Sequence, residues 1–252
     1  FSPVAAEVGP DGHLWVADWY NFIIQHNPTP NRGRGGYEAQ TGKGNAHVNP
    51  NRDRQHGRIY RLLWEGAQNR PTIVSLESAS PSALVSVIEN DNMFWRLTAQ
   101  RLLLEARATE VVELLRKKVA EESVASLHAL WILHGLGKLD REIHQAALLS
   151  ASPELRCNAI RALGNSGEDL QLLLDTAAIT AEDLGVRREA YIKMAHFDAD
   201  ATLKMAIPRL FQDKTNQQDE WLALALKTAA KNQGIAPFKT RLGSNIMPNP
   251  TV

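Results

Sequence analysis

Four alanines recur at nearly equal intervals in the middle of this chain. Ala99, Ala129, Ala159 and Ala190 each stand in a stretch rich in large apolar residues, and the intervals between them are thirty, thirty and thirty-one residues. A period near thirty residues accommodates two helices and two turns. A small residue one turn before a large apolar one also lets neighbouring helices approach closely. The repeat therefore predicts a helical solenoid, an architecture whose usual work is to hold other molecules.

Apolar periodicity and punctuation place the individual helices. Ser80 followed by Pro81 predicts the start of the helical part, while Gly137, Gly164 and Gly234 are typical of helix ends. We expect helices near residues 81–89, 92–105, 109–119, 123–136, 140–149, 153–164, 167–175, 183–195, 200–212 and 217–233.

The first part of the chain has strand patterns instead. Val4–Val8 and Leu14–Ala17 flank the turn sequence Gly9-Pro-Asp-Gly12, which predicts a β-hairpin. Residues 57–64 begin with polar and apolar residues in alternation and predict a third strand. The fold class we expect is mainly α, a solenoid preceded by a small antiparallel β-sheet.

Three segments carry little regular pattern. Residues 28–56 are rich in Pro, Gly and Asn and predict a long loop, residues 65–79 a linker, and residues 235–252 an extended tail. The predicted domains are therefore residues 1–64, with the loop inside them, and the helical repeats 80–234. The basic residues of the long loop fit an anion-binding role or a solvated surface excursion.

Composition narrows the classes of partner. Lys and Arg total 28 and Asp and Glu total 28, so the formal charge is zero, which argues against nucleic acid or an anionic membrane as the main partner. No apolar run has the length of a membrane span, and the single Cys157 excludes an intrachain disulfide, a CxxC zinc pair and a CxxCH haem motif. The partners that we expect are proteins bound through the helical repeats, because holding other molecules is the usual work of a solenoid.

Specific motifs in the first hundred residues carry a resemblance. The segment Glu7-Val-Gly-Pro-Asp-Gly-His-Leu-Trp-Val-Ala-Asp-Trp-Tyr-Asn21, then His26 and the segment from Asn51 to Arg61, resembles the last blade of the membrane-bound dehydrogenase propellers. These proteins are related to the sorbosone and glucose dehydrogenases. The segment from Asp91 to Leu103 is similar to the opening of the HEAT-like repeats that follow the propeller in that family. Here an insertion of about 20 residues separates the two halves of the blade motif.

The resemblance implies a function for a longer protein. It implies a β-propeller before this chain, HEAT-like repeats for protein docking, and a periplasmic or extracytoplasmic location. A pyrroloquinoline quinone (PQQ) or calcium cofactor would belong to the parent protein, which would oxidise a sugar or an alcohol. Because the chain begins at Phe1 directly in a strand pattern, we expect a fragment whose own part in the enzyme is docking. The alternative is a non-enzymatic HEAT-repeat scaffold capped by the small sheet.

Two carboxylates near the hairpin are the candidates for a metal. Asp11 and Asp18 stand at strand ends beside a tight turn, and carboxylates there suit a hard cation such as calcium. The competing interpretation gives both a local role, because Asp-Gly is a turn device and Asp18 has backbone amides within reach.

Candidates for a cofactor site come from the blade-like motifs. His26 and His56, with His47 and Asp53, fit a histidine and carboxylate cluster if the long loop folds back over the strand ends. Arg58 is a candidate contact for an anionic quinone. Strand alternation places it on the face of Tyr60 and opposite to Arg61, so the two arginines would not hold one ligand.

The remaining conspicuous residues predict packing. Aromatic residues at sheet positions fit a sugar-stacking platform, but blade core is the preferred interpretation for Trp15, Trp19, Tyr20 and Tyr60. On the helices we expect structural roles for the scattered histidines, for the tryptophans, and for the arginines three residues before an alanine. These are His128, His134 and His144, Trp95, Trp131 and Trp221, and Arg96, Arg156 and Arg187.

Overall fold

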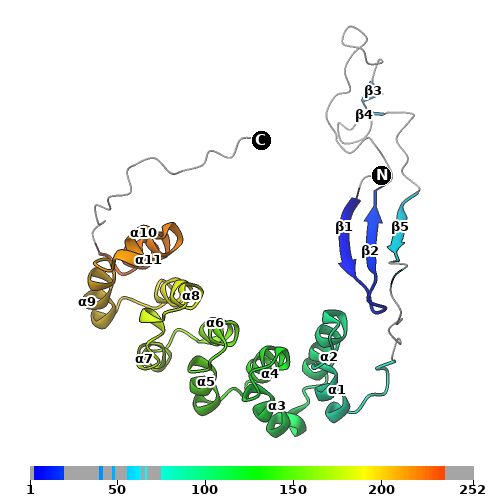
Figure 1. Cartoon of the computed structure of the whole chain (residues 1–252), viewed down its shortest axis with the longest axis horizontal. Helices are drawn as coiled ribbons and strands as arrows, with labels where there is room; N and C mark the ends of the chain where they lie inside the picture. Colours follow the sequence, from blue (N-terminus) through cyan, green and yellow to red (C-terminus); the bar gives the residue numbers. More distant parts are fainter. Residues whose placement is uncertain are drawn as a thin grey trace. The chain divides into compact units, whose positions relative to one another are not determined.

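A computed structural model describes residues 3–19, 40–41, 47–48, 56–63, 66 and 75–235. The chain divides into two compact units, one of Phe1–Ser78 with Asp91–Trp95 and one of Ala79–Asn90 with Arg96–Val252. The described residues are mainly helical and include one small three-stranded antiparallel sheet (Figure 1). The predicted mainly-α class with a small antiparallel sheet is confirmed at this level.

The sheet of the first unit is built as its sequence predicts. Strands β1 (Pro3–Val8), β2 (Leu14–Asp18) and β5 (Arg58–Leu62) pair in the order β1-β2-β5, both pairs antiparallel. Gly12 has φ +73°, a conformation that residues with a side chain adopt rarely, so the glycine fits the hairpin turn. The predicted hairpin and third strand are both confirmed.

Two short strands pair within the region expected as a long loop. Strand β3 (Gln40–Thr41) pairs antiparallel with β4 (His47–Val48). These are two-residue segments without apolar alternation, so the sequence gives no strand signal there. The rest of residues 28–55, most of the linker 65–79 and the tail after residue 235 lie outside the described residues.

Both faces of the three-stranded sheet carry exposed apolar side chains. Strand register puts Val8, Leu14 and Leu62 on one face and Trp15 and Ile59 on the other, and all five are exposed. Trp15 is 38% and Trp19 is 49% exposed. The described residues therefore form no core around these two tryptophans, and their packing in a complete blade stays a prediction.

A segment distant in sequence binds the hairpin turn within the first unit. The Asn92 Nδ2 donates to the carbonyl of Gly9 at 2.9 Å, and the Trp95 Nε1 donates to the carbonyl of Pro10 at 3.0 Å. Trp95 thus has the structural role expected of it. The Gly9 carbonyl also accepts from the Gly12 N–H within the turn, so Asn92 adds a second bond to it, while Trp95 bonds the carbonyl of Pro10.

Helices fill the second unit, although α2 begins with three residues of the first unit, and each of the ten predicted helices has a counterpart among residues 75–235. Two short elements were not predicted, the 3₁₀ helix after α7 and helix α10, whose sequence is entirely polar. None of these helices combines the length and apolarity needed to cross a bilayer. The elements are α1 (Pro81–Val87), α2 (Met93–Glu105), η3 (Thr109–Val111), α3 (Val112–Val119), α4 (Val124–Gly135), α5 (Arg141–Leu148), α6 (Pro153–Ala162), α7 (Gly167–Asp175), η4 (Ala178–Thr180), α8 (Leu184–Met194), α9 (Ala201–Leu210), α10 (Lys214–Gln218) and α11 (Glu220–Asn232).

The four alanines of the repeat lie where helices meet. Ala99, Ala129, Ala159 and Ala190 all have no exposed surface. Their helices form a row within the second unit, since α4 contacts α6, α6 contacts α8, and α8 contacts α11. Side-chain hydrogen bonds to His128 connect α2 with α4 in the same row. We call α2, α4, α6, α8 and α11 the alanine row; α1, α3 and α5 make a second row of contacts beside it (Figure 1).

Helix ends follow the punctuation of the sequence. The Ser80 hydroxyl accepts from the Ala83 N–H at 3.2 Å, with Pro81 in the first helical turn. Gly137 and Gly234 have φ +66° and +68° and end α4 and α11 as predicted. Gly164 lacks a positive φ and instead leaves space for the Asp169 carboxylate, which would lie 2.7 Å from an added Cβ.

The residue three positions before each alanine connects its helix to the preceding segment. Arg96 donates to the carbonyl of Asn90, Arg156 to that of Leu148, and Arg187 to that of Ala181. In the second repeat Ser126 takes this place and donates to the carbonyl of Lys118 at 2.7 Å. The predicted structural role of the three arginines is confirmed: they bind carbonyls that helix ends leave without intrahelical partners.

Two tryptophans and a histidine of the helices differ in their surroundings. His144 is buried and its Nε2 bonds the carbonyl of Ala159 at 2.7 Å, as expected of a packing residue. Trp131 donates from Nε1 to Asn158 Oδ1 across the α4–α6 contact. Trp221 is 60% exposed, so its expected place in a repeat core is wrong.

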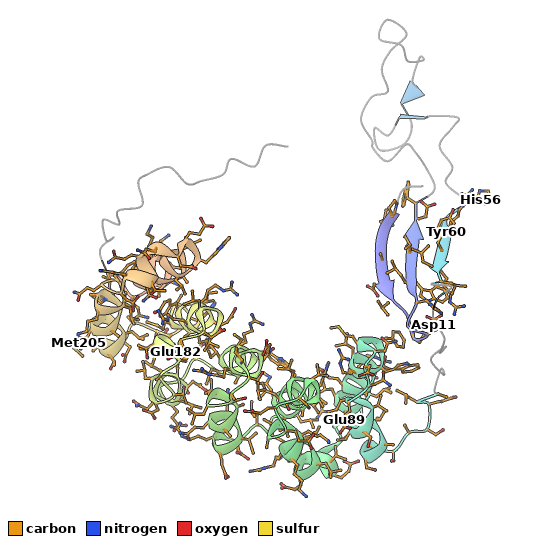
Figure 2. All side chains as sticks on the ribbon, in the orientation of Figure 1. Asp11, His56, Tyr60, Glu89, Glu182 and Met205 are labelled. Atoms are coloured by element: carbon orange, nitrogen blue, oxygen red, sulfur yellow. The ribbon has the colours of Figure 1, made fainter. Side chains whose placement is uncertain are left out.

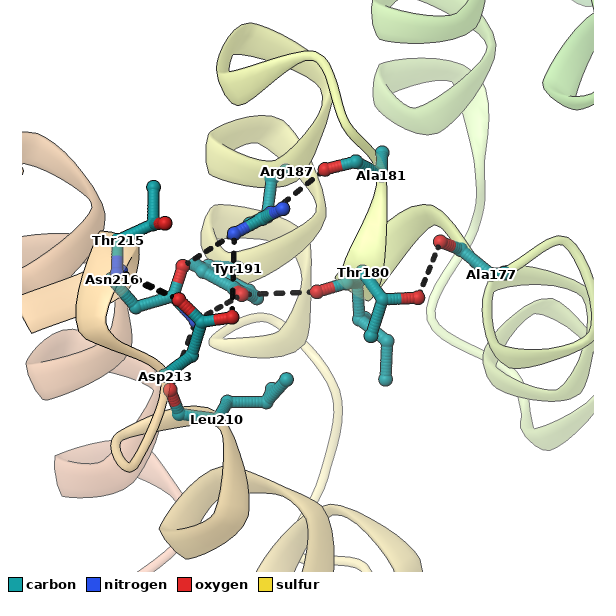
Figure 3. A network of polar contacts seen from close by, with 10 residues as sticks. Ala177, Thr180, Ala181, Arg187, Tyr191, Leu210, Asp213, Thr215 and Asn216 are labelled. Carbon is teal, nitrogen blue, oxygen red and sulfur yellow. Dashed lines mark hydrogen bonds and ion pairs between the residues drawn. The ribbon is translucent and has the colours of Figure 1, made fainter.

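A buried polar network joins α8 to α10 (Figure 3). Asn216, which is 1% exposed, donates from Nδ2 to the Tyr191 hydroxyl and to the carbonyl of Leu210, both at 2.9 Å. Its Oδ1 accepts from Arg187 at 3.1 Å. The Tyr191 hydroxyl donates in turn to the carbonyl of Ile179. Burial raises the pKa of Tyr191 to about 12.

We predict that alkali destabilises the protein through Tyr191. Below pH 10 the phenol is protonated in both states; above it the unfolded state loses the proton first, so stability falls as the pH rises toward 12. The loss is roughly 2–3 kcal/mol in the free energy of unfolding. Urea unfolding of wild type and Tyr191→Phe at several pH values measures it, and the stability advantage of the wild type should shrink above pH 10. A constant difference between the two proteins would contradict the assignment.

Candidate functional site

Asp11, a predicted metal ligand, has protein partners on its carboxylate. It accepts from the His13 N–H at 3.2 Å and from Trp15 Nε1 at 3.0 Å, and it pairs with Arg61 Nε. The Trp15 bond is the main cause that lowers the pKa of Asp11, with Arg61 adding to it and burial opposing it. The Arg61 guanidinium also lies 5.8 Å from the centre of a Trp15 ring. Asp11 thus joins the turn to two neighbouring strands.

The other candidates of the first unit gather at the opposite end of the sheet. Asp18 is buried and pairs in register with Arg58, and Arg58 donates to the Tyr60 hydroxyl at 3.1 Å. That bond confirms that Arg58 and Tyr60 share a face. His56 is exposed and precedes β5 at the end away from Asp11 (Figure 2).

These positions divide the predicted metal pair. Asp11 lies beside Trp15 and Asp18 is three residues further along the same strand, about 10 Å at 3.3 Å per residue. One cation would not contact both carboxylates. In the described part of the chain, no group of three or more His, Cys, Asp or Glu residues is placed to hold a metal ion. His26 lies outside the described residues, so its role in a cofactor site stays a prediction.

The alanine row presents a second, more extensive candidate. Successive residues of an α-helix are about 100° apart around its axis. The residues two before and two after each alanine are therefore about 200° from it, on the opposite side of the helix. None of these eight side chains is buried, although all four alanines are. We call them the open stripe: Leu97, Arg101, Leu127, Trp131, Cys157, Arg161, Arg188 and Ile192.

The open stripe combines large apolar residues with arginine and contains no acidic residue. The nearest carboxylate in its first part is Glu105, which accepts from Arg101 within the same helix at 2.9 and 3.0 Å. On α11 the exposed Trp221 and Leu224 add further apolar surface to the row.

A cleft of about 270 Å³ lies where the open stripe crosses from α6 to α8. Its apolar part is Ile160 and Ile192, and its polar part comes from the ends and facing sides of the two helices. The polar lining residues are Arg161, Asn165, Glu189, Lys193 and His196.

Glu189 is the acidic residue of this cleft and is already paired. Arg161 donates to it twice, at 2.7 and 3.0 Å, and Arg188 approaches it at 3.4 Å. The carboxylate side chain is 9% exposed, whereas Arg161 is 49% exposed. The Arg161 bonds are the main cause that lowers the pKa of Glu189, against the effect of burial. Two cations therefore share one buried anion.

Lys193 is a further cation of the cleft, and the groups that its ammonium contacts are neutral. Its Nζ donates to the carbonyl of Leu163 at 2.6 Å and to Asn165 Oδ1 at 2.9 Å, and it lies 5.5 Å from the Phe197 ring centre. Burial lowers the pKa of Lys193, and the charge of Asp169 acts in the opposite direction. Among the described residues no carboxylate forms an ion pair with this partly desolvated ammonium, so the position is favourable for an anion.

Cys157 lies beside this cleft but does not have the character of a nucleophile. Burial, followed by the charge of Glu189, raises the pKa of the thiol. The reactive form of cysteine is the thiolate, which such an environment disfavours. Cys157 contributes a small apolar surface to the open stripe.

Sequence reasoning did not find the cleft. The signal was present in the spacing: Arg161 follows Ala159 by two residues, and Glu189 precedes Ala190 by one, so stacked repeats bring them together. Opposite charges separated by almost one repeat period are the pattern that would have located the pair.

Comparison with known proteins gives one partial match. A family model described as a domain of unknown function, DUF7133, matches residues 1–65. No curated protein and no solved structure matches the chain. The matched residues cover the sheet-forming segment and leave the helices unassigned.

We predict that Glu189 contributes to stability through its two arginines. Glu189→Gln should lower the free energy of unfolding by about 1–2 kcal/mol, because it removes charge-assisted hydrogen bonds from a nearly buried position. Glu182→Gln changes an exposed glutamate for which no comparable pairing is present among the salt bridges described, and it should leave stability unchanged. Chemical denaturation of both variants tests this, and equal effects would contradict it.

Proposed function

We propose that the alanine row is a docking surface for another protein, in a HEAT-like solenoid. The observation that carries the proposal is the open stripe, where apolar residues and arginines recur at the same two positions of successive repeats. Trp and Arg are enriched among residues that dominate protein–protein binding energy. Each of these repeats buries its alanine and keeps this face accessible on a folded helix, so docking orders exposed side chains and need not order the backbone.

The small sheet supports the other half of the proposal, that it is part of a larger β-structure such as the last blade of a propeller. Antiparallel sheets with one solvated face alternate apolar and polar residues. Here Ile59 is 73% exposed on one face and Leu62 is 54% exposed on the other. Apolar residues on both faces suit a sheet enclosed between two further layers, as propeller blades are.

Oxidation of a sugar or an alcohol would then belong to the complete propeller protein, in which the helical array docks a partner. The resemblance of residues 1–105 to propeller dehydrogenases supports this wider proposal. The cofactor and the extracytoplasmic location stay predictions from that resemblance.

Site-specific cross-linking tests the docking surface. A photoreactive amino acid at Leu97 or Ile192 of the stripe should attach to one and the same polypeptide in cells that make the protein. At Met205 of α9, which is more exposed than either position but lies outside the stripe, it should not. The purified partner should bind the chain, and Leu97→Asp should weaken that binding while Met205→Asp leaves it unchanged. Equal cross-linking at the stripe and at Met205, or none, would contradict the proposal.

A further inference from the structure

We propose that the cleft between α6 and α8 is the anchor point of the docking surface and takes an acidic side chain of an extended partner segment. This inference rests on the proposed docking function and specifies its chemistry. The volume of about 270 Å³ decides the size of the occupant. Pockets for whole small molecules begin near 300 Å³ and are largely enclosed, so this cleft suits one or two side chains.

The charges around the cleft select an anion. Arg161, Arg188 and Lys193 contribute three positive charges, whereas Glu189 contributes one negative charge. Two further carboxylates of this region are engaged by local groups, Asp169 by the Ser166 hydroxyl and backbone N–H at the start of α7 and Asp183 by the Val186 N–H at the start of α8. Among the charged residues that line the cleft itself, Arg161 and Lys193 against Glu189 leave one positive charge in excess.

Lys193 is the residue that would bind the anion most strongly, because of the groups that hold its ammonium. Its ammonium group is held in place by Leu163 and Asn165, both neutral, so the direction of the group is fixed before a ligand arrives. A carboxylate at this point would gain a charge-assisted hydrogen bond in a partly desolvated site. Arg161, already occupied by Glu189, would contribute long-range attraction.

The apolar surface beside the cations indicates which kind of residue stands next to the acidic residue in the partner segment. Ile192 is 41% exposed and stands within the cleft lining, one residue before Lys193. A peptide with a large apolar side chain next to an acidic one would cover Ile192 and place its carboxylate at Lys193. The occupant we infer is therefore an acidic and apolar segment of a protein, in extended conformation.

Fluorescence anisotropy with the full chain tests this. The probes are a short, end-blocked, dye-labelled peptide of leucines and glutamates, and the same peptide with glutamine in place of each glutamate. We expect the glutamate peptide to bind more tightly than the glutamine peptide. Lys193→Gln should weaken its binding about tenfold, whereas Lys204→Gln, an exposed lysine on α9, should have no effect.

A second pair of variants tests the proposal even if Lys193→Gln fails to fold. Ile192 is exposed, so Ile192→Glu and Ile192→Gln should both fold, and the glutamate should weaken binding more than the glutamine because it repels the peptide.

Equal binding of the two peptides, or equal effects of Lys193→Gln and Lys204→Gln, would overturn the acidic anchor. Failure of the wild-type chain to bind the glutamate peptide would overturn it too. Each result leaves the docking surface to be judged by cross-linking at Leu97 and Ile192, so the two proposals fail separately.

Discussion

The helical unit depends on the close approach of neighbouring helices at four alanines. A side chain no larger than a methyl group at the contact lets helix backbones come together, and the larger apolar residues around it then fill the space on either side. Ala129 and Ala159 have no exposed surface, and Leu130, Leu133 and Ile160 beside them are equally buried. Protein interiors are packed without voids, so this spacing also fixes where every other side chain of the repeat can lie.

The same spacing explains the polar contacts. Helices that repeat at thirty residues bring side chains almost one period apart into contact, as with Trp131 and Asn158 or Arg161 and Glu189. Within each repeat, the residue three before the alanine binds a carbonyl of the preceding segment, and either arginine or serine serves. Apolar packing thus sets the distances, and hydrogen bonds then fix the angle between successive segments.

The sequence predicted the elements well and the contacts poorly, and the difference has a physical cause. Helix and strand positions depend on local periodicity and on caps such as Ser80 and Gly137, which are visible in the residues themselves. Exposure depends on what lies across an interface. Trp15, Trp19 and Trp221 were expected in a core because aromatic residues usually pack inside, yet all three are exposed among the described residues. The metal candidates failed to meet because Asp11 and Asp18 lie at different ends of β2. Their separation follows from the extended strand between them, which the sequence does predict, so the rise per residue was the signal that divides the pair.

The measurement that tests this account most directly is the stability of a protein with a larger residue at the centre of the alanine row. Ala159→Leu should lower the free energy of unfolding by about 1–3 kcal/mol in urea denaturation, because the added carbons have no space between α4, α6 and α8. Ala201→Leu, at an exposed position in α9, is the matched control and should change stability little. If Ala159→Leu were as stable as the wild type, the alanines would not set the distance between helices, and the central claim would be wrong.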